Sequence, residues 1–325
     1  MTQTEPATPA ARGRTRATPS GLRFVKGHGT RNDFVLIADT RGELDLTPDL
    51  VRRLADRRGG VGGDGVIRLV PTASLAQAGE SVADDVLAAD PTAIWFMDYR
   101  NADGSVAEMC GNGVRVFTAF AESLGLVNLA GGASFALGTR AGIKRVRKEA
   151  DGWYAVDMGP WFLPGGQDAA NGGFDAAVHV TGWDAPRPAL SVDLGNPHTV
   201  VALSSVGELE ALDLGRAPEV APVPPNGTNV ELVVPLGEQR LPDGSTVGRV
   251  RMRVHERGVG ETPSCGTGAC AAALAVRTWL AASGEVPDTW IVEVPGGQVR
   301  VRLLPGGNVE LAGPAELVHA GEISL

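Results

Sequence analysis

Residues 109–113, MCGNG, recur about half a chain length later as residues 264–268, SCGTG. Each copy reads Cys-Gly-x-Gly, and each is followed by a run of small and apolar residues that is typical of a buried helix. A polar residue precedes each cysteine at the same spacing, Asn101 before Cys110 and Glu256 before Cys265. One such motif is weak evidence, but two copies in matched surroundings indicate a duplicated unit.

Short strands flank both predicted helices. In the first half, residues 24–39 form a predicted hairpin, Thr47 and Pro48 open a helix over 49–58, and strands follow at 66–70 and 94–100 and within 135–158. A similar order of elements returns after Trp161, with a further helix near 204–213. The pattern predicts an α/β (α+β) fold of two pseudo-symmetric domains, each a mixed, mostly antiparallel sheet wrapped around a central helix.

Three segments do not fit this repeat. Residues 1–21 are rich in Pro, Thr, Ala and Arg without a hydrophobic period, and are predicted to be a disordered tail. Residues 71–93 are interpreted as an irregular insertion and residues 164–187 as an excursion from the sheet. We expect both to be surface loops.

Composition excludes several classes of protein. The net charge of −9 provides no basic surface for nucleic acid, and no apolar run is long enough to cross a membrane. The 3 cysteines include no Cys-x-x-Cys pair, and no two of the 5 histidines have the spacing of a metal site on a helix. We therefore expect a soluble, cytoplasmic protein that binds neither metal, nucleic acid nor membrane.

The paired cysteines indicate acid–base chemistry. A thiol at a helix N-terminus lies beside unpaired N–H groups, which favour the thiolate, so we expect the pKa values of Cys110 and Cys265 to be lowered. The neighbouring glycines let a carboxylate approach the same N–H groups. Two thiols on opposite faces of one carbon can remove a proton and return another with inversion. Cys270, further along the second helix, is expected in the core.

At these residues the chain resembles the diaminopimelate epimerase family, whose members interconvert LL- and meso-2,6-diaminopimelate in lysine and peptidoglycan precursor biosynthesis. The resemblance extends from Phe24 to the C-terminus. It rests on the blocks HGTRNDF (28–34), NADGSVAEMCGNG (101–113), GNPH (195–198), GTNVEL (227–232) and ERGVGETPSCGTGA (256–269). It implies the two-domain fold described above, with halves 22–158 and 159–311 and a segment 312–325 that returns to the first half. It also implies a homodimer.

The resemblance also implies roles for matching residues. Cys265 would accept the Cα proton of the LL isomer and Cys110 would donate one on the opposite face. Glu256 would bind the α-ammonium group, and Arg257 would bind the distal carboxylate. The other implied substrate-binding residues are Asn32, Asn101, Gly111, Asn112, Asn196, Asn229, Gly266 and Thr267, with His198 and Gly65 lining the pocket.

The sequence argues against two cofactors, a dinucleotide and pyridoxal phosphate. GVGGDG (60–65) has the glycine spacing of a dinucleotide-binding loop, but a helix precedes it and a strand follows, the reverse of what that motif needs. Pyridoxal phosphate requires a Schiff-base lysine, and Lys26, Lys144 and Lys148 all lack a phosphate-binding context. We therefore expect the reaction to need no cofactor.

Two alternatives and one departure stay open on sequence alone. A proline or hydroxyproline racemase shares the two-cysteine plan, although its first motif usually has His at the position of Asn112. A cysteine hydrolase or an inactive amino-acid-binding protein belongs to a different class. Many diaminopimelate epimerases carry Gln where this chain has Gly65, so this position can contribute only its backbone.

Overall fold

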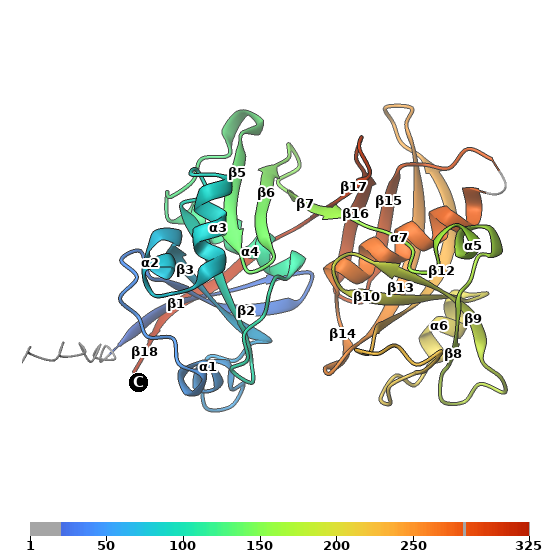
Figure 1. The fold of residues 1–325 in the computed structure, drawn as a ribbon, viewed down its shortest axis with the longest axis horizontal. Helices are drawn as coiled ribbons and strands as arrows, with labels where there is room; N and C mark the ends of the chain where they lie inside the picture. The colour runs from blue at the N-terminus through green and yellow to red at the C-terminus, as the bar shows by residue number, and fades with distance from the viewer. Residues whose placement is uncertain (1–20, 282–283, 325) are drawn as a thin grey trace, which may run out of the picture.

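The computed structural model describes residues 21–281 and 284–324, and the ribbon forms two lobes (Figure 1). Each lobe contains one central helix among β-strands, so the predicted strand-rich α/β class is confirmed. All of the predicted disordered tail except Gly21 lies outside the described residues.

The first lobe is built on seven strands that pair in chain order. The pairs β1–β2, β3–β4, β5–β6 and β6–β7 are antiparallel, whereas β2–β3 and β4–β5 are parallel. The strands are β1 (Leu22–Gly29), β2 (Asn32–Ala38), β3 (Gly65–Pro71), β4 (Trp95–Asn101), β5 (Ser134–Thr139), β6 (Gly142–Lys148) and β7 (Tyr154–Pro160). The central helix α4 (Gly111–Ser123) is buried from Gly111 to Ala121, because strands pack around it on several sides.

The second lobe surrounds helix α7 (Gly266–Ala281), which is buried on most of its surface and rich in alanine. Small side chains let the strands approach this helix closely. The remaining strands are β8 (Ala176–His179), β9 (Arg187–Asp193), β10 (Pro197–Ala202), β11 (Glu219–Ala221), β12 (Asn229–Arg240), β13 (Thr246–Glu256), β14 (Gly260–Thr262), β15 (Thr289–Val294), β16 (Gly297–Leu303), β17 (Asn308–Gly313) and β18 (Glu316–Ile323).

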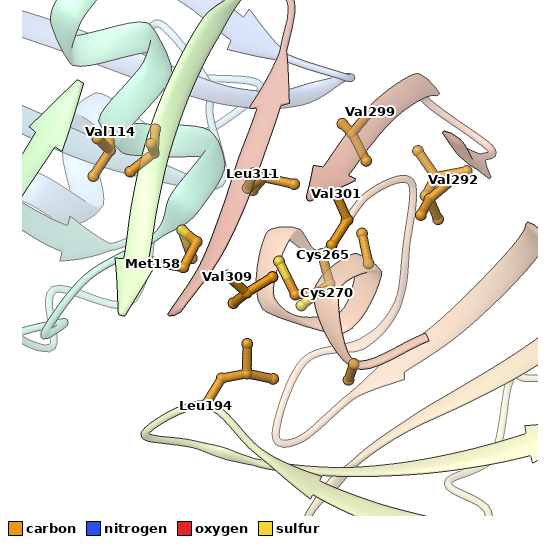
Figure 2. Packing of buried hydrophobic residues seen from close by; sticks show 14 of the residues in the cluster. Val114, Met158, Leu194, Cys265, Cys270, Val292, Val299, Val301, Val309 and Leu311 are labelled. Carbon is orange, nitrogen blue, oxygen red and sulfur yellow. The ribbon is translucent and has the colours of Figure 1, made fainter. Parts of the chain in front are cut away.

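The last two strands of the chain join the lobes. β17 pairs with β16 on one side and with β7 on the other, and β18 then pairs antiparallel with β1 (Figure 1). Figure 2 shows Leu311 of β17 between Met158 of the first lobe and Cys265 of the second. The start of each central helix is therefore packed against the same strand.

The two segments interpreted as loops contain regular structure. Residues 71–93 form α2 (Thr72–Gln77) and α3 (Ser81–Ala89), and residues 164–187 contain α5 (Gly166–Gly172) and β8. Val86 of α3 packs in a cluster with Phe96 and Ala136 of the sheet, so the surface-loop interpretation of the first segment is wrong. A short apolar helix gains stability from such packing rather than from its own sequence.

The shorter helices follow local signals. Thr47 caps α1 (Pro48–Ala55), its hydroxyl accepting a hydrogen bond from Leu50 N at 3.2 Å, as predicted. The helix ends at Ala55, before the predicted end at Arg58. Helix α6 (Val206–Ala211) lies within the predicted range, and Ala130–Gly132 form a 3₁₀ turn.

Candidate active site

Cys110 is the N-cap residue of α4. Its backbone is extended (φ −142°, ψ 122°), and its Sγ accepts a hydrogen bond from the Gly113 N–H at 3.5 Å. The same sulfur lies 3.5 Å from Oδ1 of Asn32, at the start of β2. The thiol therefore occupies the helix start that the sequence predicts.

Cys265 has the matching position before α7. Its Sγ accepts from the Gly268 N–H at 3.4 Å and lies 3.5 Å from the Thr267 hydroxyl. Cys265 is buried, whereas Cys110 is partly exposed. The two motifs are thus the same local structure in unequal surroundings.

The two helix starts are in direct contact. A Cβ placed on Gly266 would lie 3.4 Å from the Gly111 Cα and 2.9 Å from Leu311. Asn112 Nδ2 donates to the Ser264 carbonyl at 3.1 Å and lies 3.3 Å from the Ser264 hydroxyl. Because neither glycine has a side chain, the first turns of α4 and α7 approach each other closely.

Carboxylates lie close to both thiols. Glu256, at the end of β13, accepts a hydrogen bond from the Thr262 hydroxyl, and its charge acts on Cys110 and on Cys265. A second carboxylate, Glu231, bonds His198 Nδ1 at 2.7 Å, with both side chains fully buried. His198 Nε2 and Glu231 Oε2 have no hydrogen-bond partner in the described part of the chain.

These surroundings overturn the expected thiol pKa shifts. Burial raises the pKa of Cys110 to about 11 and raises the pKa of Cys265 well above its usual value. The helix N–H groups of Gly113 and Gly268 do lower these values, as predicted, but desolvation and the Glu256 charge outweigh them. Burial also raises the pKa of Glu256 itself.

Several predicted binding residues form one connected group in the second lobe. Asn196 Nδ2 donates to the Thr267 hydroxyl at 3.3 Å. Asn229 donates to the Pro197 carbonyl at 3.3 Å and accepts from the Arg257 N–H at 2.9 Å. The exposed Arg257 guanidinium donates to the Asn226 carbonyl at 2.6 Å.

Two predicted residues have other immediate partners. Asn101 Nδ2 donates to the Ser105 hydroxyl at 3.0 Å, within its own turn. Gly65 is its register partner on β3, and a Cβ there would lie 2.4 Å from the Arg100 carbonyl oxygen and 2.6 Å from Tyr99 Cε2. A side chain at position 65 would therefore require the Arg100 backbone and the Tyr99 ring to shift.

The sequence interpretation missed several contacts of the motif residues. Asp64 accepts from Asn32 Nδ2 at 2.7 Å, Thr30 Oγ1 lies 2.7 Å from Ser264 Oγ, and Arg115 donates to Asn112 Oδ1 at 2.9 Å. Asp64, Thr30 and Ser264 stand inside or beside the glycine-rich and cysteine motifs, which was the available signal. Glu231 lies within the quoted block GTNVEL, which was its signal, whereas Arg115 is an ordinary member of a helix whose burial is visible only in the fold.

The diaminopimelate epimerase family model matches residues 24–163 and 190–318, which include both cysteine motifs. The chain belongs to this family. It is 43% identical to diaminopimelate epimerase of Streptomyces coelicolor over 93% of this chain and 95% of the relative. It is also 44% identical to the Thermobifida fusca diaminopimelate epimerase over 94% of this chain and 98% of the relative.

Solved structures share the fold of the family across wider sequence distances. A hydroxyproline epimerase from Agrobacterium vitis superposes with a TM-score of 0.57 at 17% identity, covering 94% of this chain and 93% of its own. A Bacillus anthracis protein of the PhzF family gives a TM-score of 0.57 at 14% identity, covering 94% and 99%. These similarities establish the two-lobed fold alone.

The described residues contain neither a metal-binding cluster nor a membrane-spanning helix. Among residues 21–281 and 284–324, no cluster of three or more His, Cys, Asp or Glu side chains could hold a metal ion. In the same residues, no helix has the length and apolar character needed to span a bilayer.

Proposed function

We propose that this diaminopimelate epimerase inverts one α-carbon of its substrate through Cys110 and Cys265 as the two proton-transfer groups. The activity itself, an isomerase reaction of lysine biosynthesis, follows from identities above 40% over nearly the whole chain. The observation that carries the residue roles is the contact between two helix starts, each with a thiol at its N-cap.

The helix starts are suited to the reacting carboxylate. The N–H groups at Gly111 and Asn112 and at Gly266 and Thr267 lie in the first turns of α4 and α7, where backbone donors have no partner within the helix. As the Cα proton leaves, negative charge spreads onto the substrate carboxylate. Donors already oriented there stabilise that charge without reorganising.

Glu256 links substrate binding to thiol ionisation. Its charge raises the pKa of both thiols. A substrate α-ammonium group paired with Glu256 would offset this charge, so binding would lower the thiol pKa values at the moment a base is needed. For the LL isomer we assign Cys265 as proton acceptor and Cys110 as donor, with the roles exchanged in reverse.

The substrate's other end determines selectivity in this proposal. Arg257 is exposed, and its guanidinium bonds a carbonyl rather than a carboxylate. It could therefore receive the distal carboxylate, while Asn32, Asn101, Asn196 and Asn229 bind the polar groups of the substrate. The reaction needs no cofactor in this scheme, because the thiols and oriented N–H groups supply acid, base and charge stabilisation.

The state of the enzyme in the cell is also part of the proposal. We propose that the enzyme is cytoplasmic, since reduced thiols are required and the cytoplasm maintains them. We also propose a homodimer, as the resemblance to the family implies. We further propose halves 22–158 and 159–311, with the segment 312–325 belonging to the first. Light scattering on the purified chain measures the dimer, and limited proteolysis measures the boundary near residue 159.

The decisive experiment follows deuterium entry at Cα of LL-diaminopimelate in D₂O by NMR. Wild type should form meso product with exchange, while Cys110→Ala and Cys265→Ala should each lose epimerisation by at least about 1000-fold. L-Proline and a Cys270→Ala variant serve as substrate and protein controls. Epimerisation by either active-site variant at near wild-type rate would overturn the two-thiol assignment.

A further inference from the structure

Arg115 is a buried cation without a carboxylate partner in the described chain. It lies on α4, one turn after Asn112, and its side chain is fully buried. Its guanidinium donates to Asn112 Oδ1 at 2.9 Å, Thr30 Oγ1 at 3.4 Å and the Pro314 carbonyl at 3.4 Å. Nη1 has no hydrogen-bond partner among the described residues.

The burial of Arg115 without a counter-ion among the described residues lowers the stability of the folded protein. Burying a charge without a counter-ion opposes folding, and burial lowers the pKa of Arg115 to about 10, a value that still leaves it charged near neutral pH. The backbone is shaped around it: a Cβ at Gly29 would lie 3.1 Å from Nη2, and one at Gly313 would lie 3.3 Å from Cζ. Three segments distant in sequence thus enclose one guanidinium.

Arg115 fixes the orientation of the Asn112 amide. Because a guanidinium only donates, Asn112 must present Oδ1 to Arg115 and direct Nδ2 elsewhere. Nδ2 lies 3.1 Å from the Ser264 carbonyl, next to Cys265, and 3.3 Å from Asn32 Oδ1. Asn32 Oδ1 is also the group that accepts from the Cys110 thiol. One donor therefore orients a chain of contacts that reaches the Cys110 thiol on one side and Ser264, the residue before Cys265, on the other.

The charge of Arg115 acts in the direction that proton abstraction requires. The titratable groups that interact with the guanidinium are the thiols of Cys110 and Cys270, and it lowers the pKa of Cys110. Glu256 acts on Cys110 with the opposite sign. Thr30, Asn112 and Pro314, which contact the guanidinium, carry no charge of their own, so its field is not neutralised at close range.

We propose that Arg115 is a positioning residue for the epimerisation, holding the Asn112 amide that connects the two helix starts and supplying a buried positive charge that favours the Cys110 thiolate. This inference rests on the proposed roles of Cys110 and Cys265. It assigns two separable contributions to the Arg115 side chain. Its planar set of donors orients the Asn112 amide, and its charge stabilises the Cys110 thiolate.

The test compares Arg115→Met and Arg115→Lys with a buried control on the same helix, Thr118→Val. Thr118 is fully buried, and its hydroxyl donates to the Val114 carbonyl of its own helix. Each variant is measured for kcat and KM with LL-diaminopimelate. The pH dependence of iodoacetamide alkylation at Cys110 is followed by mass spectrometry, and the folded fraction by circular dichroism.

Arg115→Met should lower kcat about 100-fold with KM changed less than about threefold, and should move Cys110 alkylation to higher pH. Arg115→Lys should keep the wild-type alkylation profile, because the charge is retained, but should still lower kcat at least about tenfold, because an ammonium cannot reproduce the planar fork. Thr118→Val should leave the alkylation profile unchanged.

A folded Arg115→Met variant with wild-type alkylation and kcat within threefold would overturn the proposal. If that variant does not fold, Arg115→Lys decides: wild-type kcat with the fork removed would contradict the positioning role. These failures differ from failure of the two-thiol function. In that case Cys110→Ala or Cys265→Ala would retain epimerisation, whatever the Arg115 variants do.

Discussion

Cys110 and Cys265 begin matching helices, yet the charges around them differ. Cys110 lies beside the neutral amide of Asn32, and one carboxylate, Glu256, and one cation, Arg115, act on it with opposite signs. Cys265 is more buried and is influenced by two carboxylates, Glu256 and Glu231. The pKa of Cys110 is raised to about 11, and that of Cys265 is also raised well above its usual value.

The difference teaches that a duplicated motif provides position but not reactivity. Both sulfurs accept one hydrogen bond from the N–H group three residues later, so the helix contributes equally to each. The neighbouring side chains come from other strands and distinguish the two thiols. An enzyme that exchanges acid and base roles with direction needs two similar groups whose ionisation responds to the bound substrate.

The largest expected effect comes from removing the charge of Glu256, which acts on both thiols. Glu256→Gln should lower kcat/KM about 1000-fold, because the substrate ammonium loses its partner in a mostly buried position. The same change should speed alkylation of both thiols at pH 8, since the carboxylate raises both pKa values. The control is Glu261→Gln, an exposed carboxylate paired with Arg253, which should keep kcat/KM within threefold. Slower alkylation of either thiol in Glu256→Gln would contradict the shared influence.

Substitutions at the matched glycines, Gly113 and Gly268, compare the packing of the two helix starts through the free energy of unfolding. A Cβ at Gly268 would lie 2.7 Å from Glu231 Oε1, whereas one at Gly113 would lie 3.2 Å from Ile67 Cδ1. Gly268→Ala should therefore lower the free energy of unfolding by about 1–3 kcal/mol. Gly113→Ala should change it by less than about 1 kcal/mol, because improved helix propensity offsets tighter packing. Urea denaturation measures both, and equal losses would show that the two helix starts are packed alike.

A smaller effect should separate the thiols by charge alone. Glu231→Gln keeps an oxygen acceptor for His198 Nδ1 but removes a negative charge that raises the Cys265 pKa. The Cys265 pKa should fall, so its alkylation at pH 8 should become faster than in wild type. Cys110 serves as the internal control, since Glu256 is the carboxylate that acts on it. An equal increase in the alkylation rate of both cysteines would contradict the proposal that Glu231 acts on Cys265 and not on Cys110.

Local sequence predicted the parts of this protein that depend on neighbouring residues. Cys-Gly-x-Gly before a small apolar run predicted both N-capped helix starts, and Thr47-Pro48 predicted the start of α1. Alternating apolar residues predicted the strand-rich class, and two matched motifs predicted two halves. These features follow from backbone hydrogen bonding and side-chain periodicity, which act within a few residues. The helices in residues 71–93 were missed because they are short and depend on packing against the sheet.

Only the tertiary structure determined the electrostatics of the site. The sequence predicted lowered thiol pKa values, because a helix N-terminus is visible locally, whereas desolvation depends on every element packed around the sulfur. The enclosure of Arg115, the buried His198–Glu231 pair and the lack of room at Gly65 likewise arise from residues distant in the chain. The sequence by itself therefore determined where the thiols stand and which chemistry they suit. Their protonation depends on burial and on charges several ångströms away, which exist only once the two lobes have packed together.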